Sequence, residues 1–367
     1  MRYGILTLLL LSLLSCGHVN EYQPMVFPTE TWQEKAPEEL GVDAKKLKEA
    51  LAYWASESGE VGLEEVFIAR KGFVIYKGDS IYKKHDSHSS GQTFTSAVMG
   101  ILTDFYVIDE MTLARKIDTA MAQLYSGVRM KHFATMTSGY TGKEASPWGV
   151  PSEDPKVLPY VLGKPLFAPG TQYAYSHEAQ MMFARILTMK GGKTLKEIFD
   201  EHIGQAIGLG EYQWATAGEV NGIPINKGYD GVMVNAEQLA RFGHFFLNEG
   251  HWNGKQVVSR YWILEATNNQ VFAEKVAGTH RNDIDGRGCY GYHWWVNATL
   301  PSGNFLMPDA PKSLYYTGGL NNVVCFVIPE WEMVIVRGGE DGGLVKNRHV
   351  VYNEFFKQMG EAVTVKQ

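Results

Sequence analysis

The sequence predicts an α/β (α+β) fold in which an antiparallel sheet is flanked by terminal helices and an all-α lobe is inserted into the chain. Strand-like runs gather near both ends of the 367-residue chain, whereas helical periodicity dominates the middle. Each end also carries one helical segment. An α/β lobe that is split in sequence around an inserted helical lobe accounts for this order. The predicted boundaries are about 32–84 and 255–367 for the α/β lobe and about 85–254 for the all-α lobe.

The N-terminal part of the folded region is predicted to contain one helix and one strand pair. Asp43–Ser56 is helical, with Asp43 as a candidate N-cap, and its apolar residues recur at helical spacing. These residues are Leu47, Ala50, Leu51 and Trp54. Val66–Gly78 contains two short strands around a Lys71-Gly72 turn.

The middle of the chain is predicted to be mostly helical. Thr93–Phe105 is apolar and periodic, and Ile186 and Ile198 belong to further helices. Asn235–Asn248 is an amphipathic helix that begins at Asn235.

Strand patterns return towards the C-terminus, at Cys289–Asn297, Asn322–Pro329 and Glu332–Gly339. The last two runs are continuous and apolar, which favours a buried antiparallel hairpin. Val350–Met359 is predicted to be a closing helix.

The first 15 residues are predicted to be a secretory signal, because Arg2 precedes an apolar run that is too short to span a bilayer. Leu13-Leu14-Ser15-Cys16 resembles a bacterial lipobox, in which Cys16 is lipidated and becomes the first residue of the mature protein. A signal peptide that merely contains a cysteine is the alternative. Residues 16–31 would tether the domain to a membrane, which places it in the cell envelope (outer membrane or periplasm if the host is Gram-negative).

The composition is ordinary for a globular protein, with 45% hydrophobic and 20% charged residues. A net charge of −6 without a basic run gives no electrostatic footprint for nucleic acid, so no such partner is expected. No CxxC pair or His-rich cluster points to a metal, and no cofactor is predicted. Cys289 and Cys325 lie in apolar, strand-like runs, so buried free thiols are expected, with a disulfide as the alternative.

Seven stretches, in order from about residue 32 to the end, together resemble the serine β-lactamase and penicillin-binding-protein superfamily. The branch that they resemble most is the class C and carboxylesterase-like group of β-lactamase-related serine hydrolases. The stretches are FIARKGFVIYKG, SSGQTFTSAVMGIL, MKHFATMTSGY, FAPGTQYAYSHEAQMMFARIL, GYDGVMVNAEQLARFGHFFLNEGHWNGKQVVSRYW, YGYHWWV and YYTGGLNNVVCFVIPEWEMVIV.

The resemblance implies a catalytic set that departs from the family pattern Ser-x-x-Lys and Tyr-x-Asn. Ser89 matches the nucleophile, with Ser90 as the alternative, and Gln92 stands at the position of the lysine one turn later. Tyr175 matches the family tyrosine, and His177 replaces the asparagine. The lysine is the larger loss, because a neutral amide is a very weak base and an unassisted serine hydroxyl is a poor nucleophile.

A third motif and one loop are expected on the substrate side of the cleft. Tyr316-Thr317-Gly318 fits the family's edge-strand motif, with Tyr316 in place of the cation, and Gly319 follows it. Backbone N–H groups of this strand and of the serine would form an oxyanion hole. Trp148 lies where relatives carry a substrate-shaping loop, and a plain surface loop is the alternative.

Two functions remain open from the sequence. In the first, the protein is a serine hydrolase that acts by acyl transfer on an ester or amide, with a small-molecule, glycan or peptide substrate. Esterase-like activity is favoured over β-lactamase activity, because Tyr316 offers no cation to a β-lactam carboxylate. His177 would then serve as a relocated base, since imidazole titrates near working pH, although it could instead be a polar residue at a helix start. In the second function, the fold is catalytically inactive and binds a ligand or partner in the old cleft.

Overall fold

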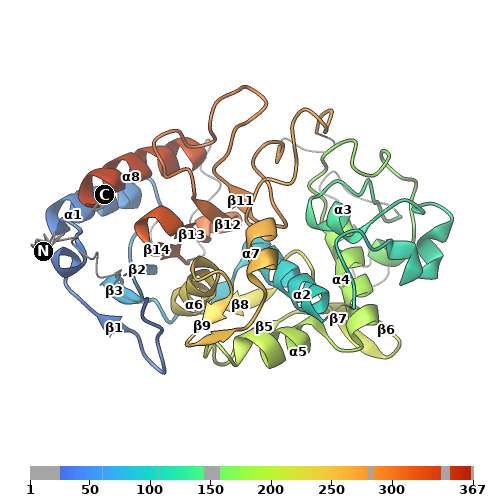
Figure 1. The fold of residues 1–367 in the computed structure, drawn as a ribbon, viewed down its shortest axis with the longest axis horizontal. Coiled ribbons are helices and arrows are strands. Elements are labelled where there is room, and N and C mark those ends of the chain that lie inside the picture. Colours follow the sequence, from blue (N-terminus) through green and yellow to red (C-terminus); the bar gives the residue numbers. More distant parts are fainter. Residues whose placement is uncertain are drawn as a thin grey trace, which may run out of the picture.

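The structure is a computed structural model that describes residues 25–59, 61–105, 107–143, 158–279, 284–339 and 348–364. The predicted signal, Cys16, most of the tether and Trp148 lie outside the described residues. One end of the molecule holds a sheet with the helices of the two chain termini, and the other end is built mainly from helices of the middle of the chain (Figure 1).

Within the described residues, the main sheet has seven strands in the order β1-β3-β2-β14-β13-β12-β11. All neighbouring strands run antiparallel except β1 and β3, so the predicted antiparallel sheet is confirmed. Its strands are β1 (Gln33–Glu34), β2 (Val66–Arg70), β3 (Phe73–Lys77), β11 (Trp295–Val296), β12 (Tyr315–Gly318), β13 (Val324–Ile328) and β14 (Met333–Arg337). The short strands outside it are β4 (His85–Asp86), β5 (Gln213–Trp214), β6 (Thr216–Val220), β7 (Ile223–Asn226), β8 (Val232–Val234), β9 (His251–Trp252) and β10 (Lys255–Gln256).

The helices of the described chain are mostly short. They are α1 (Ala44–Ser56), α2 (Gln92–Asp104), α3 (Met130–Ala134), α4 (His177–Gly191), α5 (Leu195–Phe199), α6 (Ala236–Leu247), α7 (Arg260–Ala266) and α8 (Arg348–Ala362). Single helical turns of the 3₁₀ type are Pro37–Leu40, His88–Gly91, Ala114–Lys116, Thr119–Ala122, Leu158–Tyr160, Leu320–Asn322 and Pro329–Trp331, and Asp200–Gly204 is a π-turn.

Helices cover both faces of the central strands, which explains why those strands are apolar without interruption. On one face, α1 and α8 lie side by side (Figure 1), and Trp54 of α1 packs against Phe355 of α8 and Phe326 of β13. On the other face, α6 packs on β2, β13 and β14. The N-cap of α1 is Asp43, and its buried residues are the four that helical spacing singled out, so this prediction is confirmed.

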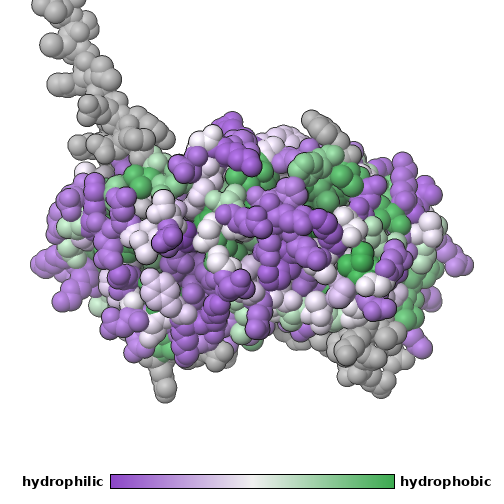
Figure 2. All heavy atoms as spheres, turned by 90° about the horizontal axis from the view of Figure 1, so that it is seen from below, coloured by the Kyte–Doolittle hydropathy of each residue, from purple (hydrophilic) through white to green (hydrophobic). Residues whose placement is uncertain are grey.

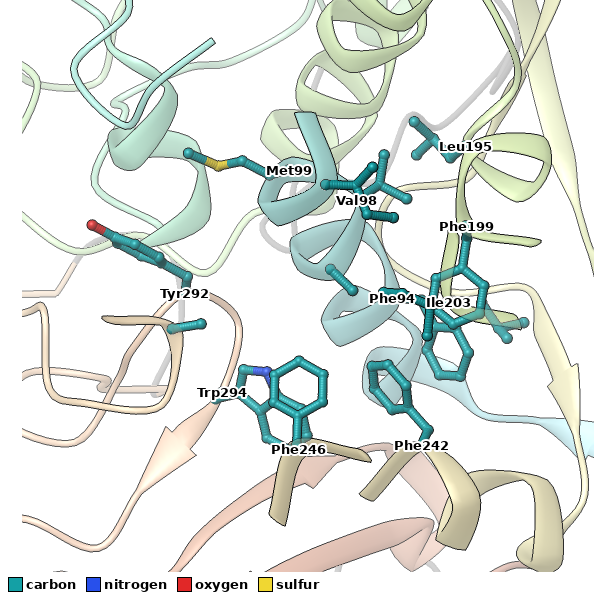
Figure 3. Packing of buried hydrophobic residues seen from close by; sticks show 14 of the residues in the cluster. Phe94, Val98, Met99, Leu195, Phe199, Ile203, Phe242, Phe246, Tyr292 and Trp294 are labelled. Carbon is teal, nitrogen blue, oxygen red and sulfur yellow. The ribbon is translucent and has the colours of Figure 1, made fainter. Parts of the chain in front are cut away.

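Helix α2 carries the candidate nucleophile turn and is held in the centre of the helical part by aromatic packing. Phe94 stacks on Phe242 of α6, with ring centroids 4.3 Å apart, and lies 5.0 Å from Phe199 of α5. Figure 3 shows these three rings gathered beside α2. Because all three are almost fully buried, the start of α2 has a fixed position relative to both α5 and α6.

Most of the predicted elements are confirmed, and one strand is wrong. The strand predicted at Cys289–Asn297 is reduced to Trp295–Val296, and the residues before it form a compact turn. Within the predicted strand His293 has φ of 65°, a left-handed value that a strand does not accommodate. Tyr290 instead forms an isolated antiparallel bridge with Trp295.

Cys289 and Cys325 are buried and unpaired, as expected from the sequence.

The described surface is mixed in polarity. On the face shown in Figure 2, hydrophilic residues predominate and hydrophobic ones form separate patches between them. Within the described ranges, no helix combines the length and the apolar character that crossing a bilayer requires.

Candidate active site

The turn that carries Ser89 is a single 3₁₀ turn, His88–Gly91, directly before α2. Asp86 holds it, because one carboxylate oxygen accepts hydrogen bonds from the N–H groups of His88 (2.8 Å) and Gly231 (2.9 Å). His88 has φ of 49°, a left-handed conformation that costs a non-glycine residue free energy. Such strain is typical of residues that aim a functional side chain.

Ser89 opens into a cavity of about 1110 Å³, whereas Ser90 does not. Ser90 is fully buried, and its hydroxyl donates to the carbonyl of Val323 at 3.2 Å. Of the predicted site residues, those that line the cavity are Ser89, Tyr175, His177, Gly318 and Gly319. Geometry therefore favours Ser89 over Ser90 as the nucleophile.

A chain of side-chain hydrogen bonds runs inward from Ser89. The hydroxyl of Ser89 is hydrogen-bonded to Tyr175. The Nε2 of Gln92 donates to the Tyr175 hydroxyl oxygen at 2.7 Å, and the hydroxyl of Tyr290 donates to Oε1 of Gln92 at 3.2 Å. Gln92 is 1% exposed, so its amide points into the protein and toward Tyr175.

The environment of Tyr175 sets how readily it loses its proton. Burial raises the pKa of Tyr175 above its ordinary value. The hydrogen bonds from Ser89 and Gln92 and the charge of Arg348 oppose this rise, but they do not cancel it. Tyr175 is therefore a neutral phenol at neutral pH, and the phenolate that could accept a proton becomes available at alkaline pH.

His177 lies at the start of α4 and lines the cavity, but it is not joined to Ser89. Its ring stacks on Tyr229, with centroids 4.4 Å apart and planes 9° from parallel, and its buried Nδ1 has no hydrogen-bond partner among the described residues. Burial lowers the pKa of His177 to about 4, and the charge of Lys227 acts in the same direction. Within the described part of the chain, the Ser89 hydroxyl is bonded to Tyr175 and not to His177. The role of His177 as base stays a prediction.

The third motif lies beside the nucleophile turn, and only its glycines reach the cavity. Tyr316 and Thr317 are fully buried, and the Thr317 hydroxyl accepts from the N–H of Cys325 at 3.0 Å. A Cβ on Gly319 would lie 2.5 Å from the carbonyl oxygen of Ser87, so only glycine allows this approach. The N–H of Gly319 donates to the carbonyl of Val323 at 2.8 Å, so it is not free to bind a substrate oxygen in this structure.

Several cavity residues were missed by the sequence prediction. Arg348 and His349 begin α8 and line the cavity together with Trp295. The Arg348 guanidinium carbon lies 5.9 Å from the centroid of the Trp295 ring, and no described residue pairs with it in a hydrogen bond or salt bridge. His349 Nε2 and the Tyr316 hydroxyl lie 2.7 Å apart in a hydrogen bond. No sequence motif marks Arg348 or His349, because they lie outside all seven matching stretches.

The charges that line the cavity are partly paired. Arg287 forms a bidentate pair with Asp285, and Asp230 lies 3.4 Å from the ammonium of Lys227. Among the described residues there is no group of three or more His, Cys, Asp or Glu side chains that could hold a metal ion. The cavity is therefore a mixed polar and apolar cleft with Ser89 at its surface.

Solved structures share this fold at low sequence identity. A putative 6-aminohexanoate-dimer hydrolase from Bacillus anthracis is 18% identical, with a TM-score of 0.65 over 94% of this chain and 90% of that one. A penicillin-binding-protein homologue from Caulobacter crescentus is 14% identical, with a TM-score of 0.65 over 88% and 99%. EstCE1, described as a hydrolase with promiscuous acyltransferase activity, is 14% identical, with a TM-score of 0.62 over 87% and 98%.

One curated relative and one family model match the sequence itself. An uncharacterised protein of Alkalihalophilus pseudofirmus is 24% identical over 189 residues, which are 47% of this chain and 53% of that protein. The chain thus spans about half the length of the curated relative that it matches. The model of the Beta-lactamase family matches residues 109–337, which is more than half of the chain. The Ser89–Gln92 turn precedes the matched stretch, so its assignment depends on the motifs and the geometry. On the family match, the chain belongs to the β-lactamase family.

Proposed function

We propose that the protein is a serine hydrolase that cleaves an ester or amide by acyl transfer, with Ser89 as nucleophile and Tyr175 as base. The observation that carries this proposal is the hydrogen-bond chain from Ser89 through Tyr175 to Gln92, at the wall of a cavity of about 1110 Å³. Tyr175 takes the role that the sequence assigned to His177, because Tyr175 is the hydrogen-bond partner of the nucleophile.

One titrating group, Tyr175, accepts and returns the proton in both halves of the reaction. The Ser89 oxygen bonds to the substrate carbonyl carbon, while its proton passes to the phenolate oxygen of Tyr175. That proton then goes to the leaving group as the bond to the acyl carbon breaks, and an alcohol or amine departs. A water molecule attacks the acyl-serine ester, gives its proton to Tyr175, and Ser89 recovers that proton as the acid leaves. Tyr175 thus ends each cycle as phenolate.

Gln92 supplies part of what the family lysine supplies. An N–H donor at 2.7 Å stabilises a phenolate through a charge-assisted hydrogen bond, but it contributes no full positive charge. Among the described residues, Arg348 is the cation whose charge lowers the pKa of Tyr175. The resulting enzyme should be slow at neutral pH and should gain activity as pH rises.

The cavity lining does not restrict the substrate to neutral esters. Tyr316 offers no cation to a β-lactam carboxylate, but Arg348 brings a cation into the cavity from another segment. A substrate panel should therefore contain a chromogenic β-lactam beside simple esters, although esters remain the favoured class. Attachment to the cell envelope through Cys16, after removal of residues 1–15, belongs to the same proposal.

Turnover of p-nitrophenyl acetate between pH 6 and 10 tests the proposal, with full-length protein purified in detergent. We expect kcat/KM to rise with pH, the S89A variant to be inactive, and the S90A variant to keep measurable activity. Tyr175→Phe should lower kcat/KM by about 100- to 10,000-fold, the usual contribution of general-base assistance. Equal activity of S89A and wild type would overturn the assignment.

A binding module without catalysis is the second candidate, and one observation favours it. The N–H of Gly319, which the family resemblance places in the oxyanion hole, is bonded to Val323. If no ester, amide or β-lactam is turned over while a ligand protects the cavity from a serine-directed probe, this second function replaces the first.

A further inference from the structure

The amide of Gln92 lies between two buried tyrosines that use it in opposite ways. Tyr290 gives its hydroxyl proton to Oε1 of Gln92 at 3.2 Å, whereas the oxygen of Tyr175 accepts from Nε2 at 2.7 Å. Tyr290 comes from the turn before β11, 198 residues away in sequence, and is 1% exposed. The two tyrosines together therefore occupy both ends of one amide.

We propose that Tyr290 is a positioning residue, which fixes the orientation of the Gln92 amide so that its NH₂ group faces Tyr175. This inference rests on the proposed function. It concerns how a glutamine serves in the place of the lysine, which neither the family match nor the sequence motifs explain.

The physical reason is that a side-chain amide can turn over and exchange its oxygen and nitrogen. In the turned-over state, Oε1 would face Tyr175 and accept its proton, and Nε2 would donate to the oxygen of Tyr290. The hydroxyl proton of Tyr290 would then be buried without an acceptor, because Gln92 is its hydrogen-bond partner within the described chain. An unsatisfied buried donor disfavours that state by about 5- to 150-fold in population.

The orientation of the Gln92 amide matters because one state stabilises the phenolate of Tyr175 and the other disfavours it. With NH₂ toward Tyr175, the amide donates to a phenolate and stabilises it. With Oε1 toward Tyr175, the amide retains the phenol proton and presents a partial negative charge to a phenolate. Only the first orientation lets Tyr175 accept the proton of Ser89.

The same turn also holds the backbone of Gln92. The Nδ1 of His293 donates to the Gln92 carbonyl at 2.9 Å, and His293 has φ of 65°. Tyr290 and His293 thus bind the side chain and the main chain of Gln92 from one segment, 288–296. A compact turn at this place, rather than the strand that the sequence predicted, brings both contacts to α2.

The variant that tests the role is Tyr290→Phe, and the chain offers a matched control in Tyr173→Phe. The rings of Tyr173 and Tyr290 lie 5.7 Å apart, both are buried, and each variant removes one hydroxyl. The hydroxyl of Tyr173 has no hydrogen-bond partner among the described residues, so its loss leaves Gln92 unchanged. Phenylalanine at 290 keeps the ring contacts with Tyr173 and Trp295.

The measurement is the pH dependence of kcat/KM. Its alkaline limb, the rise of kcat/KM with pH, reports the ionisation of Tyr175. A merely structural role would lower the rate without moving this limb. The titratable and charged groups around Tyr175 are His177, whose ring centroid lies 5.9 Å from that of Tyr175, Arg348, Tyr173 and Tyr290. Each variant changes one of these groups, Tyr290 or Tyr173, and leaves the others in place. We expect Y290F to shift the alkaline limb to higher pH and to lower kcat/KM at pH 8 by up to about 150-fold, the limit set by the preference that the Tyr290 hydroxyl supplies. Y173F should retain the wild-type limb.

A double-variant comparison separates amide orientation from other effects of Tyr290. In a Gln92→Met background the side chain has no amide to orient, so adding Y290F should no longer shift the limb. A Y290F limb that coincides with that of wild type would overturn the inference, as would an equal shift in Y173F or a shift that persists in the Q92M background.

Failure of the proposed function is distinguishable from failure of this inference. If wild type turns over no substrate, the proposed function fails, and the positioning role is measured on Tyr175 itself. Protein labelled with ¹³Cζ-tyrosine would then be titrated by NMR, with Y175F providing the assignment. A higher pKa of Tyr175 in Y290F than in Y173F supports the inference, and equal values overturn it.

Discussion

The substitution Gln92→Lys should turn this slow site into a faster one. A lysine ammonium at this position would lie between the oxygens of Tyr175 and Tyr290, where the amide nitrogen now lies 2.7 Å from the Tyr175 oxygen. At about 4 Å and an effective dielectric constant of about 20, a unit charge stabilises a phenolate by about 4 kcal/mol. That free energy corresponds to a pKa of Tyr175 lowered by about 3 units.

Only part of this gain should appear as rate. A phenolate with a lower pKa is a weaker base, and an ammonium in a site that is 1% exposed loses hydration. We therefore expect kcat/KM at pH 8 to rise by about 10- to 100-fold. The free energy of unfolding should fall by about 1–3 kcal/mol, because the side-chain partners of residue 92 among the described residues are tyrosines and not carboxylates.

The assay is hydrolysis of p-nitrophenyl acetate from pH 6 to 10, with urea unfolding measured on the same samples. Gln92→Met is the control, because it keeps the length of the side chain and removes both hydrogen bonds. The alkaline limb should move to lower pH in Q92K and to higher pH in Q92M. A folded Q92K enzyme that is no faster than Q92M at any pH would refute the reasoning about the missing charge.

Three further predictions concern the histidines and the core. His177→Ala should retain kcat/KM within about 10-fold and leave the pH limb in place, since Tyr175 is the proposed base; a loss of the order expected for a general base would contradict this. Phe94→Ala should lower the free energy of unfolding by about 3–5 kcal/mol in urea titrations, whereas Phe105→Ala, at a side chain that is 58% exposed, should change it by less than about 0.5 kcal/mol. Acidification should destabilise the protein: burial lowers the pKa of His244 to about 4 and that of His293 to about 3, so the unfolded state binds more protons below pH 6.5. The stability present above pH 6.5 should be lost progressively as pH falls toward 4, by up to about 1.4 kcal/mol per pH unit for each such histidine, and a flat profile in urea unfolding between pH 7 and 4.5 would contradict it.

Local patterns were enough to predict the elements that bury one face. Helix α1 follows from the spacing of Leu47 to Trp54 and from the cap at Asp43, since both signals lie within a few residues of one another. The β13–β14 hairpin follows in the same way from two apolar runs around the turn at Pro329–Trp331. In each of these elements the local preference and the tertiary environment favour the same secondary structure, so the prediction from the sequence agrees with the fold.

The turn at 288–296 could not be predicted from local preference. Its aromatic residues favour a strand, but the tertiary contacts of Tyr290 and His293 with Gln92 impose a compact turn with φ of 65° at His293. The motif positions of Ser89, Gln92 and Tyr175 were found because the family spacing places them together. Arg348 and His349 were missed because their contact with the cavity depends on how α8 packs on the sheet, which no local pattern encodes.

Whether a residue that matches a family motif also takes the role of that motif depends on tertiary packing. His177 aligns with a catalytic asparagine in sequence, yet its ring is held by the stack on Tyr229, and the nucleophile is bonded to Tyr175. Thr317 aligns with the third motif, yet its hydroxyl serves the N–H of Cys325 within the sheet. Sequence position alone specifies the backbone neighbourhood but not the direction of the side chain.

Labelling with a fluorophosphonate probe tests the central claim most directly, because it reports the nucleophile without knowledge of the natural substrate. The full-length protein should give one covalent adduct, located on Ser89 by peptide mass spectrometry, with a rate that rises from pH 7 to pH 10 and falls strongly in Y175F. No adduct at any pH, an adduct on Ser90, or a Y175F rate equal to that of wild type would contradict the claim.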